Sequence, residues 1–138
     1  MAIINEKFSI STLGFGDIID ITQKVQGIVS GANVESALLN VCAISPCTSI
    51  ITLEYEKGLN SDIISLLELL APVNRLYNHD ITWHDGNAFA HLRSALLAHN
   101  LTLPVMNKQI QLSNWQRIVL MDFDNKASVR DIVVSLNY

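Results

Sequence analysis

The sequence predicts an α+β fold in which a β-rich antiparallel sheet or sandwich is covered by about three helices. Short segments rich in β-branched and aromatic residues, separated by turn residues, occupy most of the chain and are typical of strands. Three other segments carry apolar residues at helical spacing. The strands of the last third follow one another with short connections, which favours antiparallel pairing. No repeat or linker divides the chain, so residues 1–138 are expected to form a single domain.

The first third predicts two strands and a helix. Residues 7–12 (KFSIST) alternate apolar and polar side chains, as in a half-buried strand, and residues 17–21 (DIIDI) form a second strand after a glycine turn. Thr22 is expected to cap a short helix that ends at Gly31. The apolar face of this helix consists of Val25, Ile28 and Val29.

An uncharged run between Glu35 and Glu54 is long enough to raise the question of a membrane span. Pro46 divides it, and its β-branched halves are better explained as two buried strands, residues 37–44 (ALLNVCAI) and 48–56 (TSIITLEYE). The sequence therefore predicts no membrane partner.

Two further helices are expected in the middle of the chain. One spans residues 61–70, with Pro72 past its end. Its apolar stripe consists of Ile63, Leu66, Leu67 and Leu70. The other begins after Asn87 as its N-cap and ends near Asn100.

The last third predicts four strands, with a turn at Asn107 and Lys108 between the first two. The expected strands are residues 101–106, 109–113, 115–123 and 129–136.

Composition limits the partners of the protein. Hydrophobic residues make up 49% of the chain and charged residues only 16%, too few to cover a monomer comfortably, so an oligomer is expected. The net charge is −4 and the nine Lys and Arg are scattered, which argues against nucleic-acid binding. The start MAIINEKF lacks the features of a secretory signal, so a cytoplasmic location is expected. In that reducing compartment Cys42 and Cys47 would be free thiols.

Three of the four histidines lie between residues 77 and 91. His79 and His84 precede the third expected helix and His91 lies in its first turns, a geometry that can bring ligands together near an anion-binding helix N-terminus. The spacings of five and seven fit no metal motif, and His84 is equally explained as a solvated turn residue. From spacing alone, both a binding site and a turn that carries imidazoles remain open.

Other polar residues have simple structural explanations. His99 at the end of a helix would interact favourably with the negative end of the helix dipole. Asp62 near the start of a helix would interact favourably with the positive end. Glu56 on a strand face is most simply solvated. Asp122 and Asp124 are explained by turn chemistry at the end of a strand.

Taken together, these segments resemble the YjbQ-like family of small trimeric proteins, often labelled secondary thiamine-phosphate synthases. The resemblance covers nearly the whole chain, through FSISTLGFGDIIDIT, CTSIITLEYE, DIISLLELLAP, YNHD, GNAFAHLRSALL, LPV, LSNWQRIVLMDFD and VRDIVVSL in order. It implies a β-rich α+β fold and a homotrimer with sites near subunit interfaces. It also implies a metal or anion held by histidines, and weak joining of a pyrimidine diphosphate to a thiazole phosphate.

The family's histidine motifs fall on the cluster described above. Its Tyr-x-His-Asp matches Tyr77, His79 and Asp80, and its later Ala-His or Ser-His matches His91. By this resemblance, His79 and His91 bind a divalent metal or a phosphate.

Further motif residues fall elsewhere in the chain. The family's Asn-Glu falls on Tyr55 and Glu56, so only the Glu is retained, and its helix Asp falls on Asp62. Its Gly-Thr-Trp-Gln falls on Ser113, Asn114, Trp115 and Gln116, without the Gly. The resemblance implies that Glu56 and Asp62 orient the histidines and that Trp115 walls the pocket.

The main departure is at Cys47, which stands where the family has the first histidine of His-Thr-Thr-Ala. A thiolate can still bind zinc, so Cys47, His79 and His91 form the implied metal set, with zinc or magnesium as the expected metal. An unperturbed thiol, with a pKa of about 8.5, would not do the acid–base work of a histidine at neutral pH.

These observations lead to three hypotheses. The first is a trimeric YjbQ-like protein with weak thiamine-phosphate synthase activity at an interface pocket for a small phosphorylated ligand. Its expected catalytic residues are Cys47, Glu56, Asp62, His79 and His91, and His84, Trp115 and Gln116 are expected to bind the ligand or cofactor. The second is a catalytically impaired trimeric binding or structural protein, because of Cys47. A metal-dependent hydrolase is the third.

Overall fold

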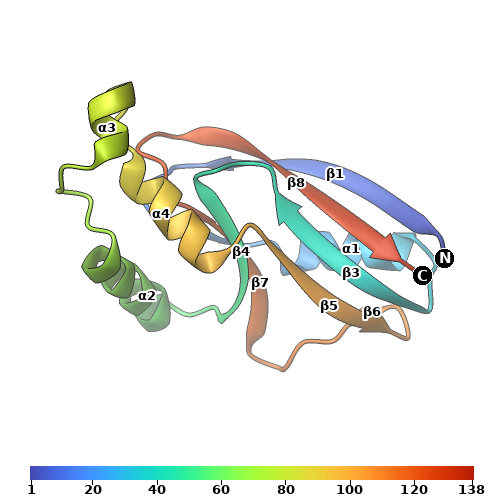
Figure 1. Ribbon diagram of the computed structural model, residues 1–138. Helices are drawn as coiled ribbons and strands as arrows, with labels where there is room; N and C mark the ends of the chain where they lie inside the picture. The colour runs from blue at the N-terminus through green and yellow to red at the C-terminus, as the bar shows by residue number, and fades with distance from the viewer.

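The computed structural model describes residues 1–138 and confirms the α+β class. Two antiparallel sheets face each other (Figure 1). The five-stranded sheet has the order β1 (Ile3–Thr12), β8 (Ser128–Asn137), β3 (Ser36–Ala43), β5 (Asn100–Met106) and β6 (Gln109–Ile110). The three-stranded sheet has the order β2 (Asp17–Asp20), β7 (Gln116–Asp122) and β4 (Thr48–Glu54).

The helices number four rather than the expected three. They are α1 (Thr22–Gly31), α2 (Lys57–Leu70), α3 (Asn78–Trp83) and α4 (Ala88–Leu97). In Figure 1, α2, α3 and α4 gather at the end of the molecule away from the two termini, while α1 lies behind the five-stranded sheet. None of these helices is long and apolar enough to cross a lipid bilayer.

Strand β7 is buried on both faces, which explains its near-continuous apolar sequence. Because side chains alternate along a strand, Ile118 and Leu120 join the larger core between the sheets and α1. Val119 and Met121 point the other way and pack in a second core beneath α2 and α4. The helices that carry the predicted site are therefore anchored on the opposite face of this strand from the main core.

The expected start of the second helix was wrong. Helix α2 begins at Lys57, because the carboxylate of Glu56 accepts hydrogen bonds from the backbone N–H groups of Gly58 and Leu59. Glu56 is solvated as expected, but it is an N-cap residue rather than a strand residue. Asp62 lies in the middle of α2 and is exposed, so it does not stabilise the helix N-terminus as expected.

Two expected cap roles were also wrong. The hydroxyl of Thr22 accepts a hydrogen bond from the backbone N–H of Ile118 on β7, at 2.9 Å, and so links α1 to the sheet instead of capping the helix. His99 lies beyond the end of α4, and its Nδ1 is 3.0 Å from the hydroxyl of buried Ser94 and 3.2 Å from the carbonyl of Thr48. This imidazole is therefore a hydrogen-bond partner for buried polar groups, and it does not cap the end of the helix.

Asp122 and Asp124 show the expected turn bonding, since Asp122 Oδ1 accepts from the backbone N–H of Asp124 at 3.0 Å, and they also form a buried ion-pair network. Arg130 donates to Asp122 at 2.6 and 3.1 Å and to Asp124 at 2.9 Å, and the hydroxyl of Thr12 donates to Asp122 at 2.6 Å. Burial alone would raise the pKa of Asp124, but hydrogen bonds from Arg130 and Asn87 hold it below its usual range. This network ties β7 and β8 together directly beside the predicted site.

Candidate functional site

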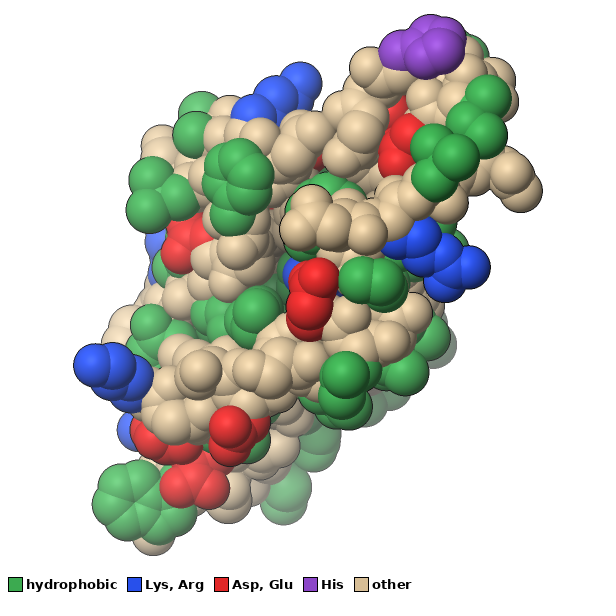
Figure 2. Space-filling model, turned by 90° about the vertical axis from the view of Figure 1, so that its left-hand side faces the viewer, with side chains coloured by type: hydrophobic (Ala, Val, Ile, Leu, Met, Phe, Trp, Pro, Cys, Tyr) green, Lys and Arg blue, Asp and Glu red, His purple; other side chains and the backbone are tan.

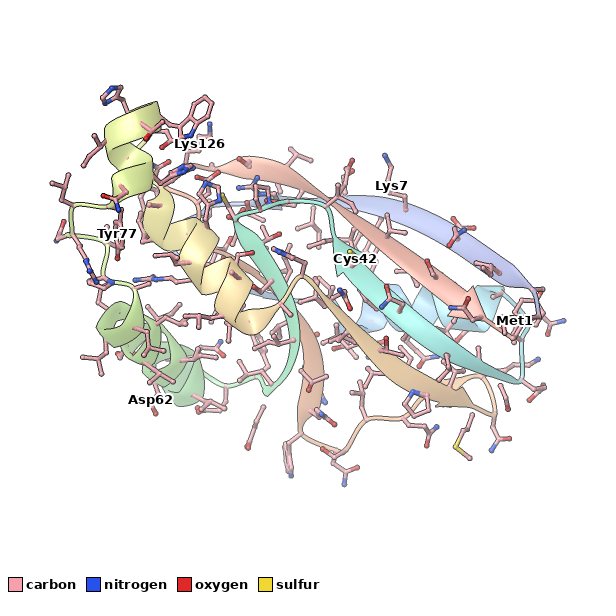
Figure 3. The ribbon with its side chains drawn as sticks, in the orientation of Figure 1. Met1, Lys7, Cys42, Asp62, Tyr77 and Lys126 are labelled. Atoms are coloured by element: carbon pink, nitrogen blue, oxygen red, sulfur yellow. The ribbon has the colours of Figure 1, made fainter.

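A pocket of about 450 Å³ lies between α3 and the first turns of α4. It is lined by Tyr77, Asn78, His79, Ala88, His91 and Leu92. Figure 3 shows Tyr77 beside α3 and α4, whereas Asp62 stands on the far side of α2. The pocket combines apolar walls with two imidazoles, a composition typical of small-molecule sites.

The structure brings together His79 and His91, two of the histidines that the sequence singled out. Their ring centroids are 4.8 Å apart and the rings meet edge to face, at an interplanar angle of 74°. His79 comes from α3, which the sequence did not predict, and His91 from the second turn of α4. His84 is not part of this pair: it is exposed, ends α3 with a left-handed backbone (φ 58°), and does not line the pocket.

His91 is oriented by the chain just before β4. Its Nδ1 lies 3.1 Å from the carbonyl oxygen of Pro46, which can only accept, so the geometry assigns the ring proton to Nδ1. The lone pair of a neutral His91 is then on Nε2. A proton on Nε2 would make the ring a donor to an anion while the bond to Pro46 is kept.

His79 has a buried nitrogen with no hydrogen-bond partner. Its Nε2 lies 3.5 Å from Asp85 Oδ1, close enough for an ion pair, but it makes no hydrogen bond. A buried polar atom without a partner costs roughly 1–3 kcal/mol. A small rotation of the His79 ring that exposed Nε2 to the pocket would let an ordered water or a ligand atom satisfy it.

The N-terminus of α4 is already occupied by a carboxylate. Asp80 Oδ1 accepts a hydrogen bond from the backbone N–H of Ala88 at 3.1 Å. Asn87 is the N-cap residue as expected, but its side chain makes no cap bond and instead donates to Asp124 Oδ1 at 3.3 Å. Asp80 therefore takes the position where the sequence suggested an anion, and a bound anion would rely on the imidazoles.

Cys47 is a buried, neutral thiol behind His91. Its Sγ lies 3.6 Å from His91 Nδ1, and the residue is only 3% exposed. Burial, and then the negative charge of Asp124, raise the pKa of Cys47 to about 11. The thiol therefore stays protonated at neutral pH and cannot replace a histidine as a proton acceptor.

This raised pKa makes stability depend on pH. Because the folded protein favours the protonated thiol, the Cys47 contribution is complete below pH 9 and is lost as the pH rises toward 11. We expect it to lower the free energy of unfolding by about 1 kcal/mol at pH 10 and about 2 kcal/mol at pH 11. Urea unfolding of the native protein and of Cys47→Ala over this range checks the prediction. A slope that is the same in both proteins would contradict it.

Cys47, His79 and His91 do not form a metal-binding group within one chain. No three His, Cys, Asp or Glu side chains converge closely enough to hold a metal ion. The sulfur of Cys47 lies beside the protonated nitrogen of His91, and so away from the nitrogen that is free to bind. A zinc or magnesium site thus remains a prediction.

Four other predicted site residues lie away from the pocket. Glu56 caps α2 and Asp62 is exposed on it. Trp115 is 73% exposed, and Gln116 donates to Thr52 at 2.9 Å. In the register of the three-stranded sheet, Gln116 pairs with Glu54 and Asp122 with Thr48, so Gln116 and Cys47 lie near opposite ends of β4, roughly 20 Å apart.

The structure gives roles at the site to three residues that were not among the predicted catalytic, ligand-binding or metal-binding residues, although Asp80 belongs to the matched Tyr-x-His-Asp motif. Asp80 starts the helix of His91, Asp85 faces His79, and Asn87 links this helix to the buried ion pairs. All three lie in the same stretch as the histidines. Their roles depend on contacts with residues far along the chain or across a turn, which residue spacing does not show.

Comparison with known proteins gives a consistent family match. The family described as UPF0047 protein YjbQ-like matches residues 6–137. A UPF0047 protein from Archaeoglobus fulgidus is 36% identical over 120 residues, which cover 87% of this chain and 91% of the relative. One from Methanothermobacter thermautotrophicus is 33% identical over 130 residues, which cover 94% and 90%. A crystal structure of a protein of unknown function from Sulfolobus solfataricus has a TM-score of 0.92 at 26% identity, with 98% and 96% of the two chains covered.

Proposed function

The chain belongs to the UPF0047 YjbQ-like family, a family of unknown function, and from this premise we propose that the His79–His91 pocket binds a small phosphorylated ligand and catalyses slow pyrimidinylmethyl transfer. The observation that carries the proposal is the paired imidazoles, with the buried, unpartnered Nε2 of His79, on the wall of a 450 Å³ pocket. Apolar walls suit a small ring, and the imidazoles suit its phosphate.

The chemistry of this transfer fits a site without a strong base. The bond between the methylene carbon and the diphosphate oxygen breaks, and its electron pair leaves with the diphosphate. The methylene carbon then bonds to the lone pair of the thiazole nitrogen, from which no proton has to leave. The barrier depends mainly on stabilising the charge of the leaving group, which donors on His79 and His91 would do.

A catalytically impaired binding protein is the second candidate, and Cys47 favours it. The neutral thiol stands beside His91, and Ile50, fully buried, fills the place where the resemblance has a small Ala. The same pocket would then bind a phosphorylated ligand without converting it.

One substitution separates these two candidates. Cys47→His would add an imidazole beside His91 as a further donor to the leaving diphosphate, and under the first proposal it should raise the rate of transfer by roughly a hundredfold. The rate is measured as diphosphate released from the pyrimidinylmethyl diphosphate in the presence of the thiazole phosphate. If neither protein shows transfer while both bind the diphosphate, the function is binding alone. If neither binds it, both candidates are wrong.

The proposed assembly is a homotrimer, in which the two separated groups of site residues meet across a subunit interface. Apolar side chains exposed on α2, α4 and the segment after α2 support an assembly (Figure 2), because a monomer rarely exposes so many. They are Leu66, Leu69, Leu70, Val73, Leu76, Leu92 and Leu96. Light scattering should give the mass of three 15.3 kDa chains, and the mass of a single chain would contradict this assembly.

A further inference from the structure

We infer that Arg75, on the segment between α2 and α3, determines the specificity of the His79–His91 pocket for phosphorylated ligands by donating to phosphoryl oxygens at its rim. The inference rests on the proposed function and names a residue and a ligand chemistry that the histidines alone do not define. It comes from three features of Arg75: its neighbour, its lack of an acidic partner, and its place beside the pocket.

Arg75 is positioned by a wall of the pocket. Its guanidinium lies 5.4 Å from the centroid of the Tyr77 ring, a cation–π contact. Tyr77 is itself fixed, because its hydroxyl donates to the carbonyl of Pro72 at 2.7 Å. The ring of Tyr77 lines the pocket together with His79 and His91. Arg75 thus rests against a rigid aromatic platform at the edge of the site.

The other three arginines of the chain are bound by carboxylates. Arg93 pairs with Glu68, Arg117 with Asp20, and Arg130 with Asp122 and Asp124. Arg75 is exposed and has neither an acidic partner nor a hydrogen bond to the protein. Its planar set of five N–H donors remains available, and this fork matches two oxygens of a phosphate.

The residues lining the pocket supply too little positive charge for a diphosphate. Among them only the two imidazoles can carry positive charge, and Asp85 lies 3.5 Å from one of them. The N-terminus of α4 is occupied by Asp80. A diphosphate bound by His79 and His91 alone would therefore be incompletely neutralised, and an arginine moving a short distance from Tyr77 would complete the neutralisation. The expected ligand is a phosphate or diphosphate ester of a small, flat, largely apolar ring.

Binding of inorganic diphosphate to the full-length protein tests this role. Calorimetry at low ionic strength should show affinity weakened about tenfold in Arg75→Ala and less in Arg75→Lys, which keeps the charge but loses the fork. Lys24→Ala is the matched control, because Lys24 is also a cation stacked on an aromatic ring, Phe8 at 4.9 Å, but lies on α1. This control should bind as the native protein does.

A neutral probe separates recognition of the phosphate from damage to the pocket. The pyrimidine alcohol without phosphate should bind equally to the native protein and to Arg75→Ala. Native affinity of Arg75→Ala for diphosphate, or equal loss of both probes, would overturn the role of Arg75 while leaving the proposed function in place. Absence of diphosphate binding to the native protein would overturn both.

Discussion

Replacing Asp122 by alanine is expected to lower the free energy of unfolding by about 3–5 kcal/mol, the largest effect of any single substitution considered. Asp122 is fully buried and accepts hydrogen bonds from Thr12, Arg130 and the backbone N–H of Asp124. Its loss would leave the guanidinium of Arg130 only partly paired and Thr12 Oγ1 without its closest partner. Uncompensated buried charge, rather than the lost attraction alone, makes the cost large.

Denaturant unfolding and differential scanning calorimetry measure this effect, and the chain offers a matched control. Asp131 follows Arg130 on β8, and its side chain is 43% exposed and accepts hydrogen bonds from Lys7 and Ser9. Asp131→Ala should change stability little. The triple variant Asp122→Ala, Asp124→Asn, Arg130→Met removes all three charges of the network together and should recover part of the loss. If Asp122→Ala were as stable as Asp131→Ala, the network would not support the site as described.

Replacing His91 by phenylalanine is expected to weaken the binding of inorganic diphosphate at least about tenfold, since a charge-assisted hydrogen bond contributes roughly 1.5–3 kcal/mol. Phenylalanine keeps an aromatic ring against His79 but loses both nitrogens and the bond to Pro46. His79→Phe should have a similar effect, because it removes the unpartnered Nε2.

The control for these substitutions is His84→Ala, which removes an exposed imidazole outside the pocket and should leave affinity unchanged. Circular dichroism and particle mass establish that each variant is folded and assembled. Native affinity in both His79→Phe and His91→Phe would show that diphosphate binds elsewhere.

The strands were largely predictable because their physical signals are local. The apolar run of β7 and the alternation of β1 follow from the side-chain period of a strand, and the structure confirms both. Helix α3 was not predictable in the same way. This helix has only six residues, too few to show a helical period. Its position is set by tertiary contacts, such as the contact between His79 and His91.

The histidine pair was partly predictable and its surroundings were not. The sequence singled out His79 and His91, and the fold brings them together. The resemblance placed Glu56 and Gln116 at the same site as the histidines. In the structure these two residues lie near the end of β4 that is farther from Cys47, because this strand is seven residues long. Hydrogen bonds such as Asn87 to Asp124 join residues 37 positions apart, and no local pattern indicates such contacts.

The most direct test of ligand binding at this pocket is to follow the imidazole signals of the four histidines by NMR while inorganic diphosphate is added. The signals of His79 and His91 should shift saturably with one shared affinity. His99, which is held by Ser94 and the carbonyl of Thr48, is the internal control and should not move. Signals of His79 and His91 that stay unchanged up to millimolar diphosphate would contradict the claim that this pocket binds phosphorylated ligands.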